Sequence, residues 1–191
     1  MKRLRRAVLV FCCLLVAIVM ACAAHAPQDW DAADAATTRL SPSAVASLPP
    51  AVRKELESRG CTIPQPFSAA TPANALRGRF MSRNQTDWAV LCSRQRKSSI
   101  LVFSNASALT VSELASQDDI ASLQSLGNGA IGFSREIQVA NPKTIAELSR
   151  RAGEPPPSPL DHDGINDAFI DKASRIWFWD GKRWIELAGS D

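Results

Sequence analysis

The stretch that decides the fold reads LRGRFMSRNQTDWAVLCSRQRKSSILVF and spans residues 76–103. Three runs rich in aliphatic and aromatic residues, 76–81, 88–93 and 100–103, are separated by two polar segments typical of turns. Because both connections are short, neighbouring strands are expected to run antiparallel. The stretch therefore predicts a three-stranded antiparallel meander.

Two short helices are predicted around the meander, over residues 49–60 and 141–150. Proline stands in the first turn of each, where its missing N–H removes no helical hydrogen bond, and glycine follows each end. Asn141 supplies an N-cap side chain for the second helix. Between the first helix and the meander, the prolines of residues 61–66 favour extended backbone.

A β-hairpin is predicted at the C-terminal end. The strand-like runs 174–179 and 184–187 flank Asp180-Gly181, which is a turn signal. With these two residues at the centre of the turn, Trp177 is expected opposite Trp184 on the neighbouring strand.

Two further segments complete the expected fold. Residues 131–140 are expected to form one strand, and residues 111–115 either a strand or a short helix. The fold class is therefore α+β, with a small antiparallel sheet or sheets, two short helices and a C-terminal β-hairpin in a single domain.

The first 26 residues have the composition of an export signal, with a basic start, an apolar run and small residues. The apolar run, 7–24, contains 18 residues and is just long enough to span a bilayer if it is retained. Cleavage is a second possibility, either after Ala23 or after Ala26, although Pro27 directly after Ala26 usually blocks a cut there. A third is acylation of Cys22, which ends a lipobox-like Val-Met-Ala-Cys sequence.

The remaining chain divides into two parts. Residues 27–47 are rich in Ala, Asp, Thr and Pro and predict a flexible tether, which leaves 48–191 as the domain. Four of the 22 Lys and Arg residues lie before the apolar run, so 18 remain against 19 Asp and Glu. A nucleic-acid-binding protein normally keeps its basic excess in the folded part, so nucleic acid is not expected as a partner.

Two cysteines, Cys61 and Cys92, follow the export signal. Thiols oxidise in exported compartments and two cysteines allow one pairing, so the sequence favours a Cys61–Cys92 disulfide. The alternatives are two free buried thiols, or a catalytic cysteine with His162 as its base.

Acidic residues gather between positions 161 and 171. Alternating carboxylates followed by Gly164 are typical of the middle of a calcium loop, although the first and last loop positions lack acids. An Asx-rich turn or helix N-cap is the alternative. The candidate metal ligands are Asp161, Asp163, Asp167 and Asp171. Calcium is the one cofactor that this pattern suggests, and a calcium-dependent binder or metal-assisted hydrolase is the corresponding function.

A ligand-binding face is the other candidate site. Trp177, Trp179 and Trp184 would stack on sugar rings if exposed, and His162 lies nearby in sequence. In strands these residues alternate, so one face is expected to build the core and the other to show one or two aromatics. His162 is a candidate metal ligand or base, with a turn histidine as the alternative.

Three segments carry a resemblance to known proteins: RGCTIPQ at 59–65, QTDWAVLCS at 85–93 and HDGI at 162–165. With these segments the chain resembles a group of exported bacterial proteins of unknown function. The chain is also similar, at residues 78–91 and 161–167, to FG-GAP or VCBS-type repeats, which implies a propeller blade and a calcium loop. A closed propeller needs four or more such units, and the chain offers at most two.

These features favour an exported, non-enzymatic binding or accessory module. The chain contains no G-x-S-x-G elbow and no complete catalytic set, so no catalytic residue is assigned. The expected location is the bacterial envelope, either in the periplasm or anchored through lipid. The expected partners are the membrane, through the N-terminal segment or a lipid on Cys22, and an envelope protein or glycan.

Overall fold

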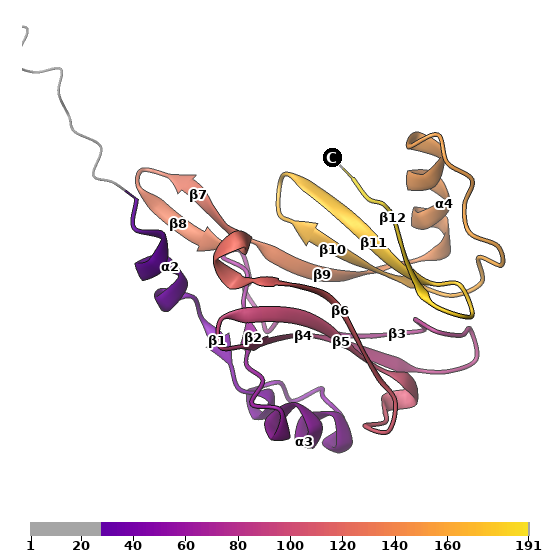
Figure 1. Cartoon of the computed structure of the whole chain (residues 1–191), viewed down its shortest axis with the longest axis horizontal. Helices are drawn as coiled ribbons and strands as arrows, with labels where there is room; N and C mark the ends of the chain where they lie inside the picture. The colour runs from indigo at the N-terminus through magenta and orange to yellow at the C-terminus, as the bar shows by residue number, and fades with distance from the viewer. Residues whose placement is uncertain (1–27, 191) are drawn as a thin grey trace, which may run out of the picture.

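The computed structural model describes residues 28–190 (Figure 1), so the expected export signal and Cys22 lie outside the described residues. The helices are α2 (Trp30–Ala36), α3 (Pro50–Ser58) and α4 (Pro142–Arg151), with 3-10 turns η1 (Pro42–Ala44), η2 (Ser104–Ala106) and η3 (Asp119–Ser122). The strands are β1 (Arg39–Leu40), β2 (Ile63–Pro64), β3 (Ala75–Gly78), β4 (Asp87–Arg94), β5 (Lys97–Phe103), β6 (Val111–Asp118), β7 (Leu123–Gly127), β8 (Ala130–Phe133), β9 (Arg135–Ala140), β10 (Gly164–Phe169), β11 (Ala173–Trp179) and β12 (Trp184–Ala188). Across residues 28–190 no helix has the length and apolar character needed to cross a membrane.

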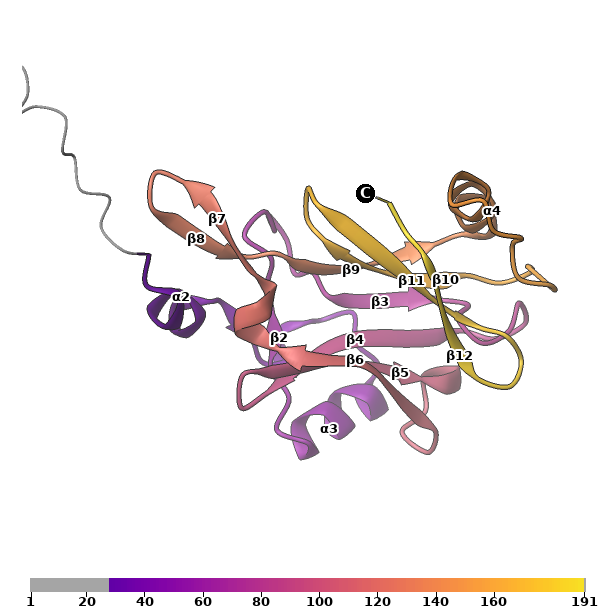
Figure 2. The same cartoon turned by 45° about the horizontal axis from the view of Figure 1, so that its top comes forward.

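Two four-stranded antiparallel sheets form the centre of the molecule (Figure 2). The first has the order β3-β4-β5-β6 and the second the order β12-β11-β10-β9. The first three strands are the predicted meander, which is confirmed, and β6 extends it, so residues 111–115 are strand rather than helix. The α+β class and the C-terminal hairpin are also confirmed.

The middle strands of the first sheet are buried on both faces, which explains their nearly continuous apolar sequence. On β4, Ala89 and Leu91 belong to the apolar cluster between the two sheets. Val90 and Cys92 alternate with them and pack into a second cluster beneath α3, which contributes Val52 and Leu56 among others.

Helix α4 covers part of the outer face of the second sheet. Ile145 of α4 packs against Ile176 and Phe178 of β11 in a third apolar cluster. The predicted N-cap is confirmed, because the Oδ1 atom of Asn141 accepts a hydrogen bond of 3.0 Å from the Thr144 backbone N–H.

The Cys61–Cys92 disulfide is present, with the two Cα atoms 5.1 Å apart. It joins the segment after α3 to β4, beside a backbone bridge in which Thr62 and Ser93 exchange hydrogen bonds of 2.9 and 2.8 Å. The sequence therefore predicted the pairing correctly, and neither sulfur is a free nucleophile.

The predicted register of the C-terminal hairpin is wrong. Trp184 lies opposite Trp179, with ring centroids 5.7 Å apart in an edge-on arrangement, whereas Trp177 lies opposite Glu186. The connection has four residues instead of two. The Asp180 carboxylate accepts hydrogen bonds from the backbone N–H groups of Lys182 and Arg183, at 2.8 and 2.9 Å, and these bonds hold the longer turn. Asp180 therefore starts the turn and is not at its centre.

The prediction of a single strand over residues 131–140 is also wrong, because the chain passes from one sheet to another at Ser134. Strand β8 pairs with β7, whereas β9 pairs with β10. At the break, the Ser134 N–H donates to the Ser122 carbonyl at 2.7 Å, and its carbonyl accepts from the Ile170 N–H at 3.0 Å. These bonds to neighbouring segments replace a regular ladder there.

A third helix lies in the segment expected to be a tether. Residues 28–47 contain α2, β1 and η1, so the structure corrects both the tether and the count of two helices. Asp29 caps α2 by accepting a hydrogen bond of 2.9 Å from the Ala32 N–H. The segment is held by the buried Val45 and by Leu40, which pack into the cluster beneath α3, and by polar contacts described below.

Candidate functional site

A groove with a volume of about 460 Å³ lies between α2, the segment that follows β2, and β8. It is lined by 15 residues, and none of them carries a charged side chain. Its lining includes the apolar side chains of Leu40, Phe67 and Ile131 and the neutral polar side chains of Thr37, Thr38, Gln65 and Thr71. The groove therefore combines apolar walls with neutral hydrogen-bonding groups.

The close approach of Phe67 to β8 requires glycine at position 132. A Cβ atom on Gly132 would lie 2.6 Å from the Cβ of Phe67, which is closer than real contacts allow. The Phe67 N–H also donates to the Phe133 carbonyl at 2.7 Å. Both features fix this wall of the groove against β8.

Gln65 closes the loop that forms another wall. Its Nε2 atom donates to the carbonyls of Ile63 and Ala73 at 3.0 and 3.1 Å, and its Oε1 atom accepts from the Ala73 N–H at 2.8 Å. Residues 66–72 are thereby held as a loop with joined ends.

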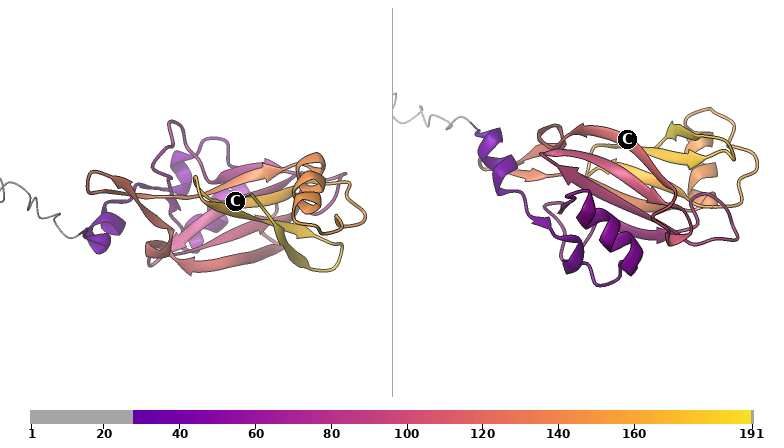
Figure 3. Two further views of the ribbon diagram at one scale, coloured as in Figure 1. Left: turned by 90° about the horizontal axis from the view of Figure 1, so that it is seen from above. Right: turned by 60° about the horizontal axis from the view of Figure 1, so that its bottom comes forward.

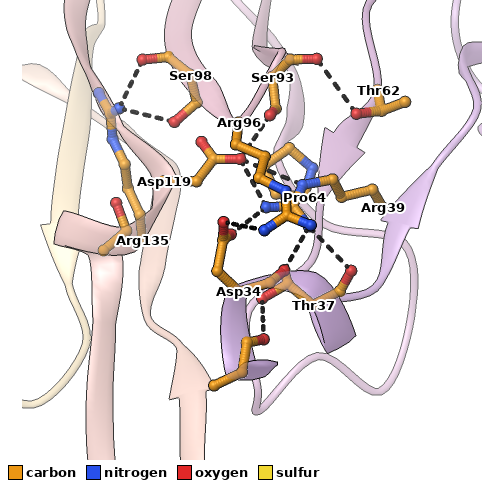
Figure 4. A network of polar contacts seen from close by, with 12 residues as sticks. Asp34, Thr37, Arg39, Thr62, Pro64, Ser93, Arg96, Ser98, Asp119 and Arg135 are labelled. Carbon is orange, nitrogen blue, oxygen red and sulfur yellow. Dashed lines mark hydrogen bonds and ion pairs between the residues drawn. The ribbon is translucent and has the colours of Figure 1, made fainter. Parts of the chain in front are cut away.

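A buried polar network holds the α2 wall in position (Figure 4). The Arg39 guanidinium donates to the Asp119 carboxylate at 2.8 and 3.2 Å and pairs with the Asp34 carboxylate of α2. It also donates to the backbone carbonyls of Asp34 and Thr37, at 2.8 and 3.3 Å. The helix is therefore attached to the domain through its C-terminal end.

The network is electrostatically balanced around Arg39. Asp119 is fully buried and also accepts from the Ser93 hydroxyl, and Asp34 pairs with Arg96 at 3.1 Å. Burial by itself lowers the pKa of Arg39, but the hydrogen bonds that it donates to Asp119 and Asp34 outweigh that effect and raise the pKa above its usual value. Arg39 therefore stays charged where α2 meets the core.

The candidate metal ligand Asp167 forms a second buried ion pair, with Arg135. Both of its carboxylate oxygens accept from Arg135, at 2.7 and 2.9 Å, and only 2% of Arg135 is exposed. The same guanidinium donates to the carbonyls of Ser98 and Ala115 in the first sheet, at 3.3 and 2.9 Å. The pair thus joins the two sheets.

The other three candidate ligands lie apart from Asp167. Asp163 accepts from the Arg79 N–H at 3.0 Å, Asp161 lies 3.9 Å from the Arg83 guanidinium, and Asp171 occupies the turn between β10 and β11. Residues 164–169 form a strand instead of a loop, so four residues of extended chain, roughly 13 Å, separate Asp163 from Asp167. Among residues 28–190, no three His, Cys, Asp or Glu side chains converge as a metal site would require.

The three tryptophans and His162 do not form one exposed face. Trp177 and Trp184 are half-buried and pack against the cluster between the sheets. His162 is 5% exposed, and its ring stacks on Phe178 with centroids 4.4 Å apart. Because Phe178 alternates with Trp177 along β11, the histidine lies on the opposite face of the sheet from that tryptophan.

No family model matches the chain, and neither a curated protein nor a solved structure shows significant similarity to it. Function is therefore inferred from the geometry of the chain itself. The groove was not among the sites expected from the sequence, although a signal for it exists. Residues 63–76 and 120–134 contain no charged residue, in a chain of which 21% is charged.

Proposed function

We propose that the chain is an exported, envelope-associated binding module whose ligand lies in the uncharged groove. The observation that carries this proposal is the groove lining, with 15 residues and no charged side chain around about 460 Å³. Small-molecule sites in proteins typically enclose roughly 300–1,000 Å³ and combine apolar walls with a few polar groups.

The lining points to a neutral, partly apolar ligand. A charged ligand group would lose its hydration in the groove without meeting an opposite charge, which is costly. Phe67 and Ile131 offer apolar contact, while the hydroxyl groups of Thr38 and Thr71 offer neutral donors and acceptors. A neutral segment of an envelope component has this chemistry.

Export is supported by two independent features. The basic start and apolar run of residues 1–26 have the composition of a signal or anchor. The Cys61–Cys92 disulfide is a bond that persists in oxidising compartments outside the cytosol.

The experiment compares two exposed alanines of α2. Ala36 lines the groove and Ala35 does not, so Ala36→Trp fills the groove while Ala35→Trp adds the same side chain elsewhere. The probe is Nile red, a neutral apolar dye, titrated against the full chain and read by its own fluorescence. Dye bound by the apolar run 7–24 is common to both variants and cancels in the comparison.

We expect Ala36→Trp to weaken the groove component of dye binding by at least about tenfold, which corresponds to roughly 1.4 kcal/mol. Ala35→Trp should bind as the wild type does. Equal titration curves for the wild type and Ala36→Trp would show that the groove is not the binding site.

A further inference from the structure

We propose that one end of the molecule, formed by α2, η3 and the β7–β8 hairpin, rests directly on the lipid bilayer of the envelope. The proposal rests on the envelope location proposed above and adds the surface that makes the contact. It concerns four side chains beside the groove, three of which, Trp30, Ile120 and Leu126, do not line it.

Four large apolar side chains at this end are exposed, and we call them the apolar end: Trp30, Phe67, Ile120 and Leu126. Their exposed fractions are 36, 42, 39 and 41%. Within residues 28–190 only two other large apolar side chains, Leu109 and Val139, are comparably exposed. Such a concentration of exposed apolar surface is typical of an interaction site.

Neighbouring elements bring these four residues together. Helix α2 contacts η3, β7 and β8, and the Gln28 side chain just before it donates to Ser125 of β7 at 2.8 Å. Phe67 and Leu126 meet over Gly132, where a Cβ atom would lie 2.6 and 2.8 Å from their side chains. Figure 3 shows α2 and the hairpin at the end of the molecule opposite α4.

The chemistry of this end suits the interface of a bilayer. Residues 120–134, which form the hairpin and all of η3 except the buried, paired Asp119, contain no charged residue, so contact with lipid would bury no free charge there. Tryptophan is the residue most typical of the membrane–water interface, and Trp30 is the exposed indole of this end.

The position of the apolar run favours a bilayer over a soluble partner. The run ends at residue 24, six residues before Trp30, and six extended residues span at most about 20 Å. Cys22 is only two residues further away. A retained anchor or a lipid on Cys22 therefore brings the bilayer surface within reach of the apolar end.

The nearby charges specify the kind of lipid. Asp29, the N-cap of α2, and Asp31 in its first turn are exposed, and no Lys or Arg lies among residues 28–38 or 120–134. Basic clusters are what attract proteins to anionic lipids, so this end is suited to zwitterionic headgroups. Anionic lipid should leave the contact unchanged or weaken it.

The experiment uses the full chain reconstituted into phosphatidylcholine vesicles whose acyl chains carry bromine, a contact quencher of indole fluorescence. Residues 1–27 contain no tryptophan, so the quenched signal cannot come from that segment. We expect bromolipid to quench the wild type, and Trp30→Phe to lose that quenching. Trp179→Phe, which removes a half-buried indole of β11, should keep it.

A second pair of variants tests the surface itself. Leu126→Asp should reduce the quenching of Trp30 at least about twofold, because the aspartate resists insertion into the interface. Leu109→Asp is the matched control, since Leu109 is 95% exposed in the turn between η2 and β6, at the far end of β6 from η3. It should leave the quenching unchanged.

Quenching equal in the wild type and Trp30→Phe overturns the proposal, as does a full chain that does not associate with the vesicles. These outcomes are separate from those of the groove, because Ala36→Trp alters dye binding without touching Trp30 or Leu126. Quenching with no effect of Ala36→Trp on Nile red would retain the membrane contact and reject the groove as the binding site.

Discussion

Arg39 in β1 and Asp119 in η3 form a buried ion pair between residues that lie 80 positions apart in the sequence (Figure 4). Asp119 is fully buried, and the same guanidinium also holds Asp34 of α2. Helix α2 in turn provides one wall of the groove and, through Trp30, part of the apolar end. One arginine thus connects the core of the domain to both proposed surfaces.

Asp119→Ala should therefore be strongly destabilising. Without Asp119, Arg39 and Arg96 share the single carboxylate of Asp34, and the buried Ser93 hydroxyl loses its acceptor. We expect this to cost about 3 kcal/mol of unfolding free energy. Urea unfolding followed by circular dichroism measures the loss. Glu147→Ala is the control, because its pair with Arg151 on α4 is exposed and should contribute less than about 1 kcal/mol. Similar small losses in the two variants would mean that the buried network does not hold the segment.

The Arg135–Asp167 pair between the sheets should show strong coupling. Asp167→Leu alone leaves a 2%-exposed guanidinium without its carboxylate and should cost about 3–5 kcal/mol. Arg135→Met combined with Asp167→Leu replaces the pair by apolar side chains and should be more stable than either single variant. A double-mutant cycle by chemical denaturation checks this, and additive losses would contradict it.

Loss of the Cys61–Cys92 disulfide should reduce stability by about 3–4 kcal/mol. The two residues lie 31 positions apart, and the loop that they close restricts the unfolded chain. Guanidinium unfolding of the Cys61→Ser, Cys92→Ser double variant gives the value. Reductant should lower the stability of the wild type to that of the variant and leave the variant itself unchanged.

Asp180 should make the C-terminal hairpin sensitive to acid. Hydrogen bonds from the Arg183 and Lys182 N–H groups lower the pKa of Asp180 below its usual value. A lowered folded-state pKa contributes stability that is complete above the unfolded pKa, about 3.9, and is lost as the pH falls through the folded value.

Thermal unfolding at several pH values tests this by comparison with Asp180→Asn, which keeps an oxygen acceptor but cannot ionise. The wild type should be the more stable protein at pH 6, and the difference should shrink progressively as the pH falls below about 4. A difference that stays constant down to pH 2 would show that the charge of Asp180 is not responsible.

Signals that act over a few residues predicted α3, α4, the meander and the strands of the C-terminal hairpin correctly. Asn141 and Pro142 start α4, and Gly60, with a φ of +70°, follows the end of α3. Capping and turn formation involve neighbouring residues, so their partners can be recognised in the sequence. The disulfide was equally predictable, because two cysteines allow a single pairing.

Short-range signals failed where a local choice depends on hydrogen bonds that the sequence leaves open. Asp180-Gly181 indicated a two-residue turn, but the carboxylate of Asp180 accepts two backbone hydrogen bonds and starts a longer loop. The register then changed by two residues, and Trp179 replaced Trp177 opposite Trp184. Likewise, the chain leaves one sheet for another at Ser134 through bonds to distant segments.

The sequence by itself determined the α+β class, the meander, the hairpin and the disulfide, because strand period, capping and cysteine number are local or countable properties. Only the tertiary structure decided that Asp167 pairs with Arg135, that α2 is held by Arg39 and that three distant segments enclose an uncharged groove. Arg135 and Asp167 lie 32 residues apart, Arg39 and its core partner Asp119 lie 80 residues apart, and the groove walls come from separate segments. Their meeting depends on how the two sheets and α2 pack, and no periodicity in the sequence encodes that packing.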